Sequence, residues 1–163
     1  MPTSTYTPLA NVTLATATST LSFSSIPATY RDLILIGNVQ AQGDSFLQYR
    51  LRVNSDTGTN YDNVRLDGNG SAPNTSGDYA ASEMTFFNSS TSGVFSVMIT
   101  NFLDYSATDK RKSVIARSSG PQNTVGVQGS SWRNTNAITS ITIFTPSGQF
   151  TVGSSWSLYG VIA

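Results

Sequence analysis

The loop between residues 54 and 62 carries a dense set of oxygen-bearing side chains. Asn54, Asp56, Asn60 and Asp62 stand at alternate or near-alternate positions, and Gly58 permits a sharp turn between them. Carboxylate and amide oxygens at this spacing suit a hard cation such as Ca²⁺. The bidentate glutamate that ends a calcium loop is absent, so we favour a loop held by Asx turns, with Gly58 at positive φ.

Three arginines form a second candidate site for contact with a partner. Arg50 and Arg52 alternate with apolar residues, and Arg65 occupies another short strand-like segment. Guanidinium groups bind carboxylates in a bidentate manner, so a shared arginine face could bind an acidic protein surface or a sugar acid. The alternative, which we favour, is a solvated face with local pairing to Asp62 or Asp67.

Aromatic residues in loops could stack on sugar rings. Tyr61, Tyr79 and Tyr105 lie in turn-rich segments and are candidates for exposed contact with a host glycan. Trp156 and Tyr159 lie in an alternating apolar segment, where core packing is the expected role.

The chain contains no His and no Cys, which excludes several kinds of chemistry. Ser–His–Asp and Cys–His nucleophiles, thiol redox chemistry, the usual zinc sites and disulfides are all removed. A glycosidase would need two carboxylates that face each other across a cleft. The candidate acids all lie near turn residues, and the sequence does not place any two of them within reach; they are Asp44, Asp56, Asp67, Asp78 and Glu83. We therefore expect no catalytic residues, no cofactor and no enzymatic activity.

The charge balance also limits the possible partners. Nine Lys and Arg residues offset nine Asp and Glu residues, whereas a nucleic-acid binder normally has a basic face. The basic turn at residues 110–112 is too small to change this expectation. The longest apolar run, residues 33–36, is far shorter than a membrane span. We expect neither nucleic acid nor a membrane as partner.

Short strands must position all of these residues. Residues 47–53 alternate strictly between apolar and polar side chains, which predicts a half-buried strand. Residues 32–37 are apolar at nearly every position, as expected of a central strand buried on both faces. About ten short segments of this kind, without helical periodicity, predict an all-β fold, an antiparallel, jelly-roll-like β-sandwich.

The polar, proline-containing start of the chain cannot contribute to a core. We expect residues 1–9 to form an N-terminal arm and residues 10–163 to form a single sandwich domain. An arm of this kind is held in place by a partner, so Thr3, Tyr6 and Pro8 are further candidates for partner contact.

Four segments spread over nearly the whole chain carry a family likeness. They are residues 21–33 (LSFSSIPATYRDL), 53–61 (VNSDTGTNY), 132–141 (WRNTNAITSI) and 150–160 (FTVGSSWSLYG). In this order they resemble segments of small virion-associated β-domains of tailed bacteriophages. The resemblance implies a structural protein of the virion, without enzymatic activity.

With this short arm, and no shaft for a fibre, we expect a capsid decoration or cement protein at the surface of the phage particle. It would stabilise the shell through contacts with the major capsid protein or other virion proteins. Closed symmetry favours a homo-oligomer, with a trimer as the preferred unit. The alternative is a receptor-binding module of a tail or head fibre that reads host glycans.

Overall fold

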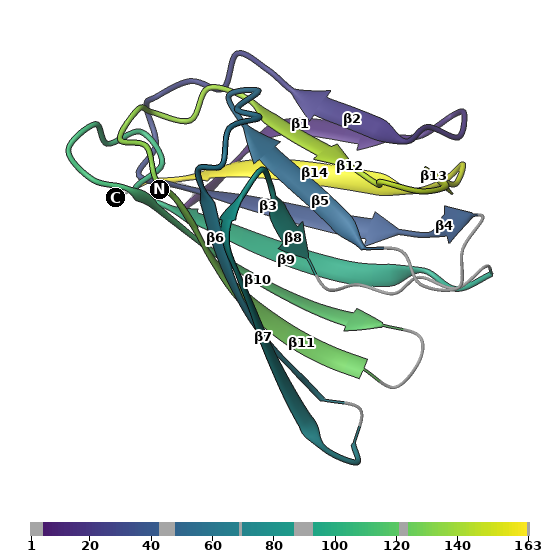
Figure 1. Cartoon of the computed structure of the whole chain (residues 1–163). Helices are drawn as coiled ribbons and strands as arrows, with labels where there is room; N and C mark the ends of the chain where they lie inside the picture. The colour runs from purple at the N-terminus through teal and green to yellow at the C-terminus, as the bar shows by residue number, and fades with distance from the viewer. Residues whose placement is uncertain (1–4, 43–47, 69, 87–92, 121–123, 163) are drawn as a thin grey trace.

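The chain folds into two antiparallel β-sheets that pack face to face (Figure 1). The computed structural model describes residues 5–42, 48–68, 70–86, 93–120 and 124–162. The larger sheet consists, in spatial order, of β1 (Tyr6–Thr13), β14 (Ser155–Val161), β3 (Asp32–Val39), β9 (Ser96–Leu103), β10 (Lys112–Gly120), β11 (Thr124–Trp132), β6 (Tyr61–Gly68) and β7 (Pro73–Ala81).

The smaller sheet covers part of one face of the larger one. Its order is β2 (Thr20–Phe23), β12 (Ile141–Phe144), β5 (Tyr49–Val53) and β8 (Met84–Phe86). A short pair, β4 (Ala41–Gln42) with β13 (Gln149–Phe150), lies outside both sheets. The predicted all-β, antiparallel sandwich is confirmed, whereas this sheet order does not confirm a jelly roll.

The alternation that predicted a strand at residues 47–53 matches the burial observed in β5. Tyr49, Leu51 and Val53 point into the core, while Arg50 and Arg52 lie on the other face and are half-buried. Residue 47 lies outside the described part of the chain. Period-two alternation places successive side chains on opposite faces, so the pattern specifies both the strand and its orientation.

The core between the sheets is built from apolar and aromatic side chains. Trp156 is buried, as its alternating segment predicted, and its ring meets Phe150 edge-on at a centroid distance of 4.9 Å. Tyr49 packs on the other side of Phe150, with ring centroids 5.4 Å apart. Aromatic groups of this size contribute much of the apolar area that a sandwich buries.

The N-terminal segment differs from the expected arm. Tyr6 to Leu9 belong to β1, an edge strand of the larger sheet that pairs with β14. Residues 6–9 therefore belong to the sheet, through hydrogen bonds to β14, and do not form an arm outside the domain. Thr3 lies outside the described residues.

Strand β3 also differs from its prediction. Leu33 and Leu35 are fully buried, but Ile36 on the opposite face is 36% exposed. The second layer covers only one face of the larger sheet, so β3 is not buried on both sides (Figure 1). Across the described ranges, no helix is long and apolar enough to cross a membrane.

The smaller sheet ends before the larger one does. Beyond β8, the strands β10, β11, β6 and β7 continue, and β7 lies farthest from the smaller sheet (Figure 1). Residues 73–80 of β7 are exposed, so neither face of this edge strand is covered. This part of the larger sheet presents an inner surface beside β8, where side chains of β11 and β6 are still buried, and an outer surface on its far side.

Candidate functional site

The loop at residues 54–62 is held by its own carboxylate. Asp56 accepts hydrogen bonds from the backbone N–H of Gly58 at 2.8 Å, from the Asn60 amide at 3.0 Å and from the Trp132 indole N–H at 2.7 Å. Burial raises the pKa of Asp56, but these three hydrogen bonds outweigh it, so the pKa lies below its ordinary value. The favoured interpretation, an Asx-turn loop, describes this geometry.

The other oxygens of the loop are also directed away from a common centre. The Asn54 side-chain oxygen accepts the backbone N–H groups of Thr139 and Ser140, which lie on a different loop. No group of three or more acidic side chains that could hold a metal occurs among the described residues. These contacts assign the loop oxygens to structural hydrogen bonds.

One detail of the loop prediction is wrong. Gly58 does not have a positive φ; instead Asn54 (φ 51°) and Ser55 (φ 55°) adopt the left-handed conformation. Asparagine tolerates this region because its short polar side chain can bond locally. Gly58 serves a different purpose, since a Cβ there would lie 2.9 Å from the Asn60 amide nitrogen.

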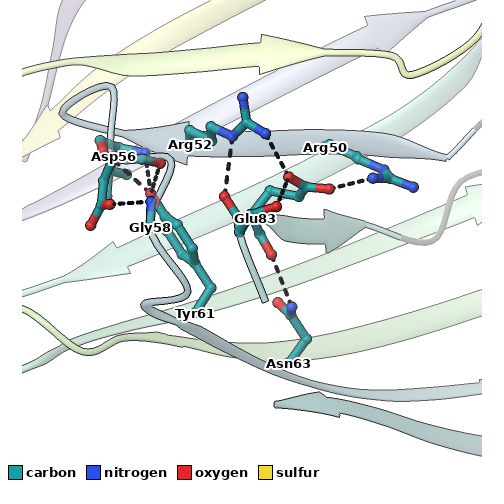
Figure 2. Close-up of polar contacts among 9 residues, drawn as sticks. Arg50, Arg52, Asp56, Gly58, Tyr61, Asn63 and Glu83 are labelled. Carbon is teal, nitrogen blue, oxygen red and sulfur yellow. Dashed lines mark hydrogen bonds and ion pairs between the residues drawn. The ribbon is translucent and has the colours of Figure 1, made fainter. Parts of the chain in front are cut away.

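Two of the predicted arginines pair with Glu83, which was considered as an acid and not as their partner. Glu83 is 8% exposed and lies between the guanidinium groups of Arg50 and Arg52 (Figure 2). Arg52 donates to one carboxylate oxygen at 2.7 Å, and the hydroxyl of Ser82 donates to the same oxygen at 2.6 Å. Burial raises the pKa of Glu83, and these donors lower it further than burial raises it.

Arg65 follows the local pairing that we favoured. Its Nε donates to the Asp67 carboxylate at 2.7 Å along the same strand. Arg50 and Arg52 pair with Glu83 and not with Asp62 or Asp67. All three arginines are half-buried in internal ion pairs rather than exposed as one basic face.

A buried polar cluster lies next to Glu83. Asn63 on β6 donates to the backbone oxygen of Glu83 at 3.0 Å and accepts the hydroxyl of Ser130 at 2.8 Å. The Gln128 amide on β11 donates over longer distances, 3.5 Å to the Asn63 side-chain oxygen and 3.4 Å to the Ser130 hydroxyl. These polar side chains are buried, and their hydrogen bonds to one another and to the Glu83 backbone compensate for the loss of water.

A polar cleft opens beside this cluster, where β8 ends. Its volume is about 310 Å³, and it lies between the edge of the smaller sheet and the inner faces of β6, β7 and β11. Its walls carry no aliphatic or aromatic residue; they are Gln48, Arg50, Asn63, Arg65, Ser76, Gly77, Asp78, Glu83, Thr85 and Gln128. A cleft with this lining can bind a polar ligand through hydrogen bonds.

Two of the three tyrosines proposed for sugar contact are in the core. Tyr61 and Tyr105 are fully buried, so the expectation that they are exposed is wrong. The Tyr61 hydroxyl donates to the Asp56 carbonyl at 3.0 Å, and burial raises its pKa to about 12. Tyr79 is 71% exposed, but its ring lies beside Gly77 on the outer face of β7, away from the cleft.

The outer face of the larger sheet is the most extensive apolar surface of the described chain. Alternation and strand register place exposed or half-exposed apolar side chains on all eight strands of this face. The central ones are Ile34, Ile36, Val97, Ile99, Ile115 and Val127, with Tyr6 and Tyr159 at one edge and Val64 and Leu66 near the other. Large contiguous apolar patches on a soluble domain mark interaction sites.

One cation stands in the middle of this outer face. Arg117 on β10 is exposed and, among the described residues, makes no hydrogen bond or ion pair. It separates two shallow hollows of about 340 Å³ and 240 Å³, the first lined also by Ile34, Ile99 and Tyr159. The acids Asp32 and Asp62 lie only at one end of the strands of this face.

The partner-contact candidates are thus divided between different surfaces. Tyr6 and Pro8 are exposed on the outer face of β1, and Tyr79 on that of β7. Arg50 and Arg65 line the polar cleft on the inner side. Sequence reasoning missed Arg117, because residues 114–117 (VIAR) do not alternate between apolar and polar side chains.

The basic turn contains a residue whose burial was also missed. Lys112 is 1% exposed, and its ammonium group donates to the backbone oxygens of Ala107, Lys110 and Thr135. Burial lowers its pKa. Lys112 therefore closes a loop from inside rather than contributing to a basic surface.

Comparison with known proteins identifies no relative of this chain. No family model, no curated protein and no solved structure matches the chain.

Proposed function

We propose that this protein is a non-enzymatic structural component of a tailed-phage particle, a decoration or cement protein that docks through the outer face of its larger sheet. The observation that carries the proposal is the apolar outer face, which spans all eight strands and has one central charge. The sequence resemblance to virion-associated β-domains supports a place on the phage particle and leaves the site on it open.

The composition of the outer face suits a permanent contact. Stable protein interfaces bury about 800 Å² on each partner and have a core depleted of charged residues. Val127 and Ile115 are 50% and 43% exposed, so a partner that covers them removes apolar area from water. Such burial stabilises the bound state of both partners by mass action.

Arg117 has no ion-pair partner among the described residues, so a docking partner is expected to present an acidic group opposite it. A second copy laid face to face would bring two Arg117 groups near one another without an acid in the central part of either face. A partner with an acidic group between apolar residues satisfies the guanidinium and fills the two hollows beside it. The shell surface is the partner we propose, with homo-oligomers formed through other surfaces.

Two of the acids that we considered for hydrolysis, Glu83 and Asp56, are occupied by internal contacts, which supports a non-catalytic role for them. Both carboxylate oxygens of Glu83 are bound by arginine, and the Asp56 carboxylate is filled by three donors. A general acid or base must exchange protons with a substrate, which these contacts oppose. The proposed mechanism is therefore adhesion.

The experiment compares add-back of variants to purified particles that lack the protein. Val127→Asp places a charge on the outer face, while Val152→Asp changes a similarly exposed valine, 58% exposed, in a loop before β14. Circular dichroism first establishes that both variants fold. We expect Val152→Asp to bind and restore heat resistance, and Val127→Asp to do neither.

Two results would overturn the proposal. Equal binding of both variants would remove the outer face as the docking surface. Absence of the protein from purified particles would remove the structural role itself.

A further inference from the structure

We propose that the polar cleft beside β8 binds one residue of a neutral glycan. This inference goes beyond the docking function and does not depend on it, because the cleft and the outer face lie on opposite sides of the larger sheet.

Strand register assembles the cleft from five strands, β6, β7 and β11 of the larger sheet and β5 and β8 of the smaller one. Asn63 lies opposite Asp78, and Arg65 lies opposite both Ser76 and Gln128. In the smaller sheet, Thr85 on β8 lies opposite Arg50 on β5. Paired side chains point to the same side of their own sheet, and the two sets meet beside the edge strand β8, where they line one cleft.

The cleft has hydrogen-bonding capacity that the protein does not use. Within the part of the chain that the structure describes, the side chains of Gln48, Ser76, Asp78 and Thr85 form no hydrogen bond. They offer one amide, two hydroxyls and one carboxylate, a mixture of donors and acceptors. This mixture fits a ligand that bears several hydroxyl groups, each of which both donates and accepts.

The charged side chains around the cleft sum to zero net charge. Three guanidinium groups, those of Arg50, Arg52 and Arg65, are balanced by the three carboxylates of Asp67, Asp78 and Glu83. A charged sugar would have to be desolvated without a net opposite charge to compensate it. A neutral sugar avoids this cost.

The size and lining of the cleft define the ligand further. Pockets for small molecules begin at roughly 300 Å³, and this cleft of about 310 Å³ holds a single monosaccharide unit. The walls lack an aromatic platform, so each contact depends on hydrogen bonds. A monosaccharide with about 12 heavy atoms is then expected to bind with a dissociation constant on the order of millimolar.

The test is an amide chemical-shift titration of the ¹⁵N-labelled protein with single sugars. D-glucose, D-galactose, D-mannose and N-acetyl-D-glucosamine are the neutral probes, and D-glucuronate is the charged one. We expect at least one neutral sugar to give saturable shifts confined to β5, β6, β7, β8 and β11 and to the neighbouring Gln48. The apparent affinity should not change between 50 mM and 500 mM salt.

Variants identify the contacts. Asp78→Asn removes the free carboxylate, and Thr85→Val replaces the hydroxyl with a methyl group while keeping the shape of the side chain. Each substitution should weaken sugar binding at least fivefold. Asp109→Asn, at an acid whose side chain is 78% exposed outside the cleft, is the matched control and should bind like the unaltered protein.

Three outcomes would overturn the inference. They are the absence of saturable shifts with all four neutral sugars, binding of glucuronate alone, and binding that survives both cleft substitutions. None of these outcomes bears on the docking of the outer face, so the two proposals fail independently.

Discussion

The carboxylate of Asp56 accepts the indole N–H of Trp132 at 2.7 Å, which joins two residues 76 positions apart in the sequence. The contact fastens the loop after β5 to the end of β11. Because Trp132 is 1% exposed, its N–H has little access to water and depends on this acceptor. The hydrogen bond explains why an aspartate with cation-ligand spacing acts as a structural residue.

This contact predicts energetic coupling between the two residues. In a double-mutant cycle with Asp56→Ala and Trp132→Phe, we expect a coupling free energy of about 1 kcal/mol, since Asp56 is half-exposed and solvent weakens the bond. Urea unfolding of the four proteins measures it. Additivity within about 0.3 kcal/mol would contradict the structural role of the pair.

The decrease in the free energy of unfolding at acidic pH should depend on Glu83. Its pKa is held below the ordinary value of 4.5, so its ion pairs stabilise the fold above that pH, and this contribution is lost as the pH falls through the folded-state pKa. We expect Glu83→Gln to be destabilised at pH 7 and to approach the unaltered protein below pH 4.5. Urea midpoints measured from pH 7 to pH 2.5 test this, and a pH-independent difference would contradict it.

Lys112 should be one of the most sensitive charged residues. Lys112→Met keeps the length of the side chain but leaves three backbone oxygens without their donor, which should cost about 2–4 kcal/mol of unfolding free energy. Lys110→Met is the control, because its side chain is 50% exposed and solvent screens its surface ion pair with Asp104. Equal losses in the two variants would show that burial of Lys112 does not matter.

Gly160 should tolerate no side chain. A Cβ there would lie 2.4 Å from the ring of Tyr30, so Gly160→Ala forces the ring to move and should cost about 1–3 kcal/mol. At Gly129, also within a strand of the larger sheet, a Cβ meets nothing within 4 Å. Thermal unfolding should therefore separate Gly160→Ala from Gly129→Ala, and similar melting temperatures would refute the steric explanation.

Local patterns were sufficient to predict the strands. The alternation in β5 and the apolar run in β3 specify strands because the side-chain period along a strand is two residues. The same patterns do not reveal how large each sheet is. The exposure of Ile36 follows from a second layer of four strands over a sheet of eight, and such pairing between distant segments is not a local property.

The candidate sites show the same limit. The Asx-turn interpretation of the loop around Asp56 was confirmed because its main contacts, to Gly58 and Asn60, are close in sequence. The burial of Glu83 and Lys112 depends on partners that the fold brings from other segments, 31 and 33 residues away for Glu83 and 23 residues away for one oxygen at Lys112. The side on which an exposed tyrosine lies depends likewise on the assembled sheet.

The orientation of the protein on intact particles tests the central claim most directly. A cryo-electron microscopy map of purified particles, fitted with this fold, would show which surface meets the shell. We predict that the outer face of the larger sheet lies against the shell, with Arg117 inside the contact. A map in which that face points to solvent, while another surface is docked, would contradict this account.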